Sequence, residues 1–459
     1  MPGLQLLKPY QQTIAQAVLE SVLYNRGLTF TVEIAHHGGA REISAHLELF
    51  LLSAHALSGA RHLKVTPEPS NQAAERLTQL LGSRQTSGLW SQEAHEVRVG
   101  RAHQIFLDPT MLDHISSSVG LGPVGLLEVE EAQTISQDTY KRHLAPLTEA
   151  SGATTVLYGF PWNGSTWFER QKEENRQAEG SDALQRHFRV PWQQVAQHNP
   201  LYAQYVAQER ARYGEEHPCV QSQYDLRPMA FNAPLLSPTL RRSLQGAHLR
   251  RSSPQPGKAY IASVRVIRRT PATKLRGDTV LSGFGETLVV TIAEQGPSQS
   301  HHSGPTLRVV EHRWWQSRGL ARESAPLVHL LRNVWKCQRV VLEVSEEVPE
   351  LASLLRQTLG ATIVETVEKS ATVDSQTVLE FLAAAGSDRL NIYAPNGSRE
   401  HRALWYELDA AQAQYQDDGF VALEMSGPED GLLRGLLLLF AIKRKDTTKD
   451  VRQLASAIA

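Results

Sequence analysis

A run of β-branched residues that stops at two glycines and continues as an apolar helical pattern constrains the fold of this chain most. In TVEIAHHGGAREISAHLELFLLSAH (31–55), the pattern predicts a buried strand, a loop at Gly38-Gly39 and a helix from about Glu42. This order is typical of loops that hold phosphate with backbone N–H groups and a helix N-terminus. Such a loop carries a lysine after its last glycine, where this chain has Ala40, so an ordinary Gly-Gly turn stays open as the alternative.

The length and charge of the chain set bounds on its domains and partners. A chain of 459 residues predicts two or three domains. Lys and Arg number 47 against 48 Asp and Glu, so contact with DNA would need local basic patches. The longest apolar stretch, 431–442, is too short to span a bilayer and contains Arg434, so we expect no membrane segment. Two widely separated cysteines without metal-ligand spacing favour a reducing cytoplasm.

Strand and helix patterns alternate along the chain. The segment 235–258 is basic and ends rich in Ser, Pro and Gly, a composition that resists forming a core, so we place a domain boundary there. A strand at 259–267 opens the second half. The sequence therefore predicts two α/β domains joined by a basic linker. Strand patterns of the first half lie at 31–35, 62–67, 95–99, 104–108, 125–130 and 154–159.

Two adjacent carboxylates follow the apolar strand in GLLEVEEAQ (125–133), namely Glu130 and Glu131. ATPases use one such carboxylate to hold Mg²⁺ and the next to polarise the attacking water. The first is usually an aspartate, and Glu130 is one methylene longer. The alternative is a pair of acids that stabilises a helix N-terminus by its charge.

Together these stretches resemble the large terminase subunits of tailed bacteriophages, in which an ATPase domain precedes an RNase H-like nuclease domain. The resemblance is carried by the order and spacing of several segments rather than by a single motif. These segments are LKPYQQTIAQAVLESVL (7–23), AHHGGAREISAHLELFLL (35–52), LLEVEEAQTIS (126–136), SGATTVLYGFPWNGSTWFERQK (151–172) and HFRVPWQQVAQHNPLYAQYVAQERARYGEEHP (187–218).

The resemblance implies a division of the chain into domains. The first would be a P-loop ATPase-like α/β domain, 1–230, with a helical lid at about 166–228. A basic linker, 231–258, would lead to an RNase H-like α/β domain, 259–445, and a C-terminal tail, 446–459.

For the first domain, the resemblance implies a degenerate site for ATP with Mg²⁺. Glu130 and Glu131 would be its acidic pair. Ala40 stands where the family has its lysine, and losing that cation costs about 3–4 kcal/mol of charge stabilisation. The residues expected around the nucleotide are Gln12 (or its neighbour Gln11) near the adenine, His37 (or His36) in the family's arginine position, Gly38, Gly39, Ala40 and Arg41.

For the second domain, the resemblance implies three carboxylate positions that would hold two metal ions. The first, in YIASVR (260–265), is occupied by Arg265, and the second, in VVLEVSEE (340–347), by Glu343. The third, in GPEDGLL (427–433), offers Glu429 and Asp430. An arginine removes a ligand and adds a positive charge, so we expect no metal here and an ion pair of Arg265 with Glu343 or Asp430.

Three functional hypotheses remain open from the sequence. The favoured one is a terminase-like protein that keeps both folds, has lost both chemistries, and binds double-stranded DNA, a small terminase or portal-type partner, or an active homologue. The second is an active ATP-driven DNA-packaging motor with Arg41 in place of the lysine, which the resemblance would assemble as a homo-oligomeric ring. The third is a prophage remnant. The basic runs 241–253 and 443–452 are either DNA contacts or a solvated linker and tail.

Overall fold

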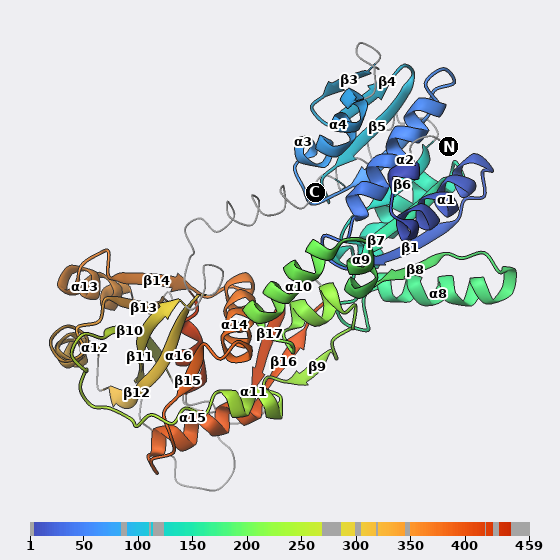
Figure 1. Cartoon of the computed structure of the whole chain (residues 1–459). Coiled ribbons are helices and arrows are strands. Elements are labelled where there is room, and N and C mark those ends of the chain that lie inside the picture. Colours follow the sequence, from blue (N-terminus) through green and yellow to red (C-terminus); the bar gives the residue numbers. More distant parts are fainter. Residues whose placement is uncertain are drawn as a thin grey trace, which may run out of the picture.

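The computed structural model consists of two α/β halves, each built on its own sheet (Figure 1). No helix in the described part is long and apolar enough to cross a membrane. The structure describes residues 4–83, 90–109, 112, 124–268, 286–298, 304–317, 320–344, 349–417, 419–425 and 431–441.

The first half contains an eight-stranded sheet, in which a hairpin edge continues a parallel core. Helices cover both faces, so most side chains of the parallel strands are buried and apolar, with buried charges at Glu33, Lys64 and Glu128. In spatial order the strands are β3 (Trp90–Glu93), β4 (Glu96–Val99), β5 (Ala102–Leu107), β2 (Arg61–Val65), β6 (Val124–Val129), β7 (Thr154–Gly159), β1 (Thr29–Ile34) and β8 (His187–Val190).

Helices α1 and α2 pack against each other and share a hydrophobic cluster with β1, and α2 also contacts α4. Helix α7 contacts β6, and α8 contacts β1. The long helices are amphipathic or capped as expected; Thr166, for example, caps α8 through its side chain. The helical elements of this half are η1 (Leu4–Leu6), α1 (Pro9–Leu23), α2 (Ala40–Ala54), α3 (Ser70–Ala73), α4 (Glu75–Ser83), η3 (Ala132–Thr134), α6 (Gln137–Thr139), η4 (Tyr140–Leu144), α7 (Ala145–Glu149), α8 (Trp167–Asp182), α9 (Trp192–His198), α10 (Pro200–Tyr213) and η5 (Val220–Tyr224).

The second half contains a six-stranded mixed sheet and a small antiparallel sheet. In spatial order the large sheet runs β14 (Val364–Glu368), β13 (Arg339–Val344), β10 (Ala259–Arg268), β11 (Glu286–Ser298), β12 (Pro305–Ser317) and β15 (Leu390–Ile392). The small one runs β17 (Val421–Met425), β16 (Ala411–Tyr415) and β9 (Asn232–Pro234). The helical elements are α11 (Pro238–Ser243), α12 (Leu320–Val328), η6 (His329–Val334), α13 (Pro349–Leu359), α14 (Ala371–Gly386), α15 (Arg399–Ala410) and α16 (Leu432–Leu438).

The predicted α/β fold of both halves is confirmed, but the expectation that the basic segment cannot join a core is wrong. Strand β9 pairs with β16, and Leu240 and Leu244 are buried in the core of the second half. Arginines of the segment form ion pairs with acids of that half, such as Arg251 with Glu294 at 2.6 Å. Composition alone does not reveal these partners, because they lie far away in the sequence. The second basic run, 443–452, lies outside the described residues.

The turn after β7 joins the two halves. Trp162 Nε1 donates to the carbonyl oxygen of Gln416 at 2.9 Å. The buried amide of Asn163 donates to the carbonyl of Tyr415 at 2.6 Å and to the carboxylate of Asp417 at 2.9 Å. Strand β7 lies between β6, which precedes the acidic pair, and β1, which precedes the glycine loop. The turn that follows β7 thus connects the region of the predicted ATP site with the second half.

Candidate functional site

The loop between β1 and α2 has a well-defined backbone. Gly39 caps α2 in the left-handed region, with φ of 98°, and a Cβ placed there would lie 2.2 Å from the Gln11 amide nitrogen. The Tyr10 hydroxyl donates to the Gly38 carbonyl at 2.8 Å, and the Gln11 amide donates to the Gly39 carbonyl at 3.2 Å. Gly39 is therefore required by the close approach of α1 and by its positive φ, whereas a Cβ at Gly38 would lie 2.6 Å from the Ala35 carbonyl oxygen.

Gln11 rather than Gln12 contacts this loop. The Gln12 amide donates instead to the Leu7 carbonyl at 2.7 Å. Successive residues on a helix point about 100° apart, so only one of the two can face the loop. Of the two glutamines expected near the nucleotide, Gln11 is therefore the one that contacts the loop, and a contact of either with the adenine stays a prediction.

Two histidines follow the end of β1 on the exposed side of the loop. The His36 and His37 ring centroids lie 3.9 Å apart, and His37 has a positive φ of 57°. The backbone of His36 is tied to the segments that follow β8: the Tyr202 hydroxyl donates to its carbonyl at 2.6 Å, and its N–H donates to the Gln223 carbonyl at 2.8 Å. The predicted lid region therefore holds the loop through the backbone.

The first turn of α2 can receive an anion, but the adjacent cation is already paired. The N–H groups of Ala40, Arg41 and Glu42 open the helix and have no partner within it, as at any helix N-terminus. Arg41 forms an ion pair with Glu68, and 64% of its side chain is exposed. These residues fit a phosphate group through the backbone and lack the lysine that would neutralise its outer charge.

The two predicted acids at the end of β6 occupy different environments. The Glu130 carboxylate is mostly buried, accepts from the Thr66 hydroxyl at 2.7 Å and lies 3.0 Å from the Lys64 ammonium. Burial alone would raise its pKa, but the charge and hydrogen bond of Lys64, the Thr66 hydrogen bond and the charge of Arg41 together outweigh burial, so the pKa is lowered. Glu131 is exposed and has a positive φ of 51°. The two acids therefore differ in environment: Glu130 is mostly buried and paired with Lys64, whereas Glu131 faces solvent.

Lys64 is the residue that sequence reasoning missed at this site. It lies on β2, beside β6, and only 3% of its side chain is exposed. The signal was present in HLKVTP (62–67), where a lysine interrupts an otherwise buried strand. Its partners belong to other segments and could not be read from that strand.

In the second half, the expected ion pair of Arg265 with Glu343 is present. Arg265 Nε donates to Glu343 Oε2 at 2.6 Å, with 13% and 16% of the side chains exposed. The two residues stand one position beyond Val264 and Leu342, which pair in parallel register on β10 and β13. Glu429 and Asp430 lie outside the described residues.

Asp374, on α14, is a further acid near this pair that the sequence analysis did not select. Burial raises the pKa of Asp374, while Arg434 at 3.9 Å lowers it in part. Among the described residues, no three His, Cys, Asp or Glu side chains are placed to hold a metal ion. Of the residues named for this centre, the two that the structure describes are Arg265 and Glu343, and a guanidinium paired with the carboxylate does not fit a divalent ion between them.

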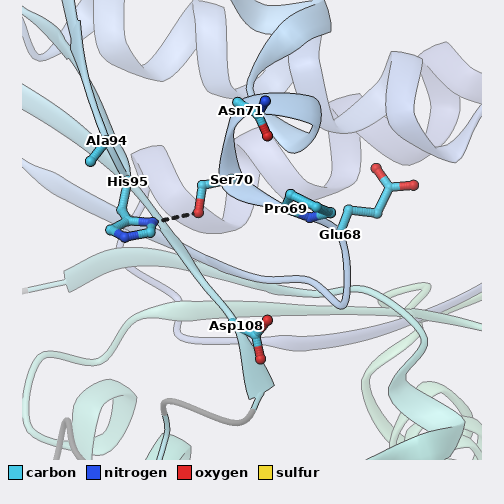
Figure 2. A pocket seen from close by; sticks show the side chains of 7 residues that line it. All are labelled: Glu68, Pro69, Ser70, Asn71, Ala94, His95 and Asp108. Atoms are coloured by element: carbon cyan, nitrogen blue, oxygen red, sulfur yellow. Dashed lines mark hydrogen bonds between the residues drawn. The ribbon is translucent and has the colours of Figure 1, made fainter.

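A shallow hollow of about 370 Å³ lies at the carboxyl ends of β2 and β5 (Figure 2). The Ser70 hydroxyl and His95 Nδ1 form a hydrogen bond of 2.6 Å within it. The hollow adjoins the loop through Glu68, the partner of Arg41. Its lining residues are Glu68, Pro69, Ser70, Asn71, Ala94, His95 and Asp108.

The chain is similar in structure to large terminases. No protein-family model and no curated protein matches it in sequence. The large terminase of a thermophilic bacteriophage matches with a TM-score of 0.59 at 10% identity, over 94% of this chain and 98% of that one. The same protein in complex with ADP matches with a TM-score of 0.58 at 10% identity, over 95% and 99%. The resemblance to large terminases is thus confirmed for the fold, over nearly the whole of both chains.

Proposed function

We propose that this chain is a terminase-large-subunit-like protein of phage or prophage origin that has lost ATP hydrolysis and DNA cleavage and acts by binding. The observation that carries this proposal is the ion pair of Arg265 with Glu343. Two-metal nucleases need several carboxylates around closely spaced divalent ions. A guanidinium at one of these positions repels both ions and also occupies a remaining carboxylate.

The phosphate loop supports the same proposal for ATP hydrolysis. Its backbone and the first turn of α2 suit the phosphates of a nucleotide, while Ala40 supplies no charge and Arg41 is paired with Glu68. Preorganised cations at the transferred phosphoryl group provide much of the rate enhancement of such enzymes. The loop is therefore suited to retaining a phosphate ligand rather than to hydrolysing it.

The second candidate is an active DNA-packaging motor that hydrolyses ATP with Mg²⁺. The observation in its favour is the loop itself, since the hydrogen bonds of Tyr10 and Gln11 to the two glycine carbonyls keep the cradle formed. In this reading Arg41 would leave Glu68 and face the nucleotide, with Glu130 and Glu131 as the acidic pair.

The partners proposed for the binding role are those that a terminase-like fold suggests: double-stranded DNA, a small terminase, a portal-type protein, or further copies of this chain. The proposed location is the cytoplasm of a bacterial host. Binding of the full chain to linear duplex DNA, measured by fluorescence anisotropy at two salt concentrations, tests the DNA component directly.

Two assays decide between the candidates. The proposal expects no DNA-stimulated ATP hydrolysis with Mg²⁺ and no cleavage of plasmid DNA with Mg²⁺ or Mn²⁺. Calorimetric titration with ATP then compares the wild type with Ala40→Lys, and with Ala54→Lys at the exposed far end of the same helix as the control. Tighter binding by Ala40→Lys alone would support a formed cradle that lacks its cation. DNA-stimulated hydrolysis by the wild type would overturn the proposal in favour of the motor.

A further inference from the structure

Lys64 is a buried lysine whose ammonium group is held by three oxygens. Its Nζ lies 2.8 Å from the Ser44 hydroxyl, 3.0 Å from Glu130 Oε1 and 3.5 Å from Glu48 Oε1. Ser44 and Glu48 lie on α2, the helix that begins at the phosphate loop, whereas Glu130 follows β6. An ammonium group has three protons, so these oxygens account for its full hydrogen-bonding capacity.

This arrangement joins the same two elements that a divalent metal joins in a phosphate-loop ATPase. There, a helix hydroxyl and the carboxylate after the acidic strand hold the Mg²⁺ shell. Here the Lys64 ammonium connects Glu130 with the hydroxyl of Ser44. Ser44 lies on α2, about one helical turn beyond Arg41. The Thr66 hydroxyl binds the other Glu130 oxygen at 2.7 Å. Both oxygens of the carboxylate are therefore occupied by groups of the chain itself.

The charges of the cluster are compatible with a single internal cation. Glu128 is fully buried beside this cluster, and burial together with the charge of Glu48 raises its pKa to about 8. The Tyr158 hydroxyl donates to this carboxyl at 3.1 Å. Burial also raises the pKa of Glu48. Lys64 and Glu130 form the closest ion pair of the cluster, at 3.0 Å, and the Lys64 charge helps to lower the pKa of Glu130.

We propose that Lys64 replaces the divalent metal at Glu130, so that a phosphate-bearing ligand binds the loop without Mg²⁺. The metal-free binding rests on the proposed role of the loop as a phosphate site. The replacement itself rests only on the contacts of Lys64. A divalent ion could enter only by displacing an ammonium group that is already surrounded by oxygens and whose side chain is only 3% exposed.

Mn²⁺ binding by the full chain, followed by electron paramagnetic resonance, tests the replacement without any nucleotide. Wild type and Glu130→Gln should bind the same number of Mn²⁺ ions. Lys64→Met, which keeps the length of the side chain and removes its charge, should gain one Mn²⁺ that Lys64→Met/Glu130→Gln loses. Lys172→Met is the matched control, because Lys172 is also buried and contacts two carboxylates, Glu33 at 2.6 Å and Glu169 at 2.7 Å.

Two results would overturn the replacement. One is a Mn²⁺ ion bound by the wild type and absent from Glu130→Gln, a comparison that stands even where Lys64→Met fails to fold. The other is a folded Lys64→Met, verified by its melting curve, that gains no Mn²⁺ beyond the gain of Lys172→Met.

Pyrophosphate titration separates this proposal from the proposed function. Equal affinity of the wild type in EDTA and in Mg²⁺ supports metal-free binding, and a tenfold gain with Mg²⁺ contradicts it. If the wild type binds neither pyrophosphate nor Mn²⁺ at Glu130, the loop is not a phosphate site, but the replacement of the metal by Lys64 still stands. Mn²⁺ at Glu130 without ATP hydrolysis would refute the replacement and leave the loss of catalysis intact.

Discussion

The ion pair of Arg265 with Glu343 should contribute far more to stability than an otherwise similar pair on the same sheet. Arg339 and Glu365, on β13 and β14, also meet at 2.6 Å, but 24% and 39% of their side chains are exposed, against 13% and 16% for Arg265 and Glu343. The two pairs thus share chemistry and distance and differ mainly in burial. Comparing them isolates the effect of desolvation.

The expected magnitude follows from the geometry. Unit charges about 3 Å apart attract by roughly 5–6 kcal/mol at an effective dielectric constant of about 20. Desolvation offsets much of this, so we expect a coupling energy of about 2–3 kcal/mol for Arg265 with Glu343. For Arg339 with Glu365 we expect at most about 1 kcal/mol. Glu343→Gln alone should cost about 3 kcal/mol, because it removes a carboxylate 2.6 Å from the mostly buried Arg265 guanidinium.

Two double-mutant cycles measure these energies by urea unfolding. One comprises Arg265→Met, Glu343→Gln and both together, and the other Arg339→Met, Glu365→Gln and both together. Tryptophan fluorescence follows the unfolding, and one of the chain's eight tryptophans, Trp335, is fully buried and packs against Tyr260 of β10 at 5.0 Å. A coupling energy for Arg265 with Glu343 below about 0.5 kcal/mol, or no larger than that of the control pair, would refute the reasoning.

Three further predictions concern single substitutions. Gly39→Ala should lower the free energy of unfolding by about 1–3 kcal/mol, since its φ is 98° and the new Cβ would meet Gln11. The control Gly180→Ala should cost nothing, because no atom lies within 4 Å of the new Cβ. Equal shifts of the melting temperature would contradict this. Asn163→Ala should lower the free energy of unfolding by about 1–3 kcal/mol, because it removes buried hydrogen bonds between the two halves. A melting profile unchanged in calorimetry would show that these bonds do not stabilise the contact between the halves. The folded pKa of Glu128, about 8, exceeds its ordinary 4.5, so the folded state binds the proton more tightly. Wild-type stability should therefore fall between pH 4.5 and 8, by up to about 1.4 kcal/mol per pH unit, relative to Glu128→Gln, and parallel profiles would disprove it.

Local pattern was sufficient to predict the main elements near the site. The β-branched run before Gly38-Gly39 became β1, and the apolar periodicity after it became α2, because each pattern is set by residues close together in sequence. The pairing of Arg265 with Glu343 was one of the two predicted, the other being with Asp430, which lies outside the described residues. That prediction needed the strand order of the resembling family, since the two residues are separated by two long strands and two helical elements.

The features that were missed depend on which strands become neighbours. Lys64 meets Glu130 because β2 lies beside β6, and the partners of the basic segment 241–253 come from strands and helices that follow it in the chain. Gln11 and Gln12 both fit a helix, and only the packing of α1 against the loop selects Gln11. These contacts are tertiary, so neither composition nor periodicity specifies them.

In both halves a base lies on a strand that is parallel and adjacent to the strand carrying or preceding its acid partner. Lys64 pairs in register with Glu128 across β2 and β6, and Arg265 stands beside Glu343 across β10 and β13. A base on one strand can then neutralise an acid on the next without moving the backbone of either strand. An acid that faced only like charges would be costly to bury, so a chain that ceased to use metal would be stabilised by such a base. On this argument, Glu130→Gln should rescue part of the stability that Lys64→Met removes, as Glu343→Gln should for Arg265→Met. If neither rescue occurs, the bases hold the sheets by packing rather than by compensating the acids.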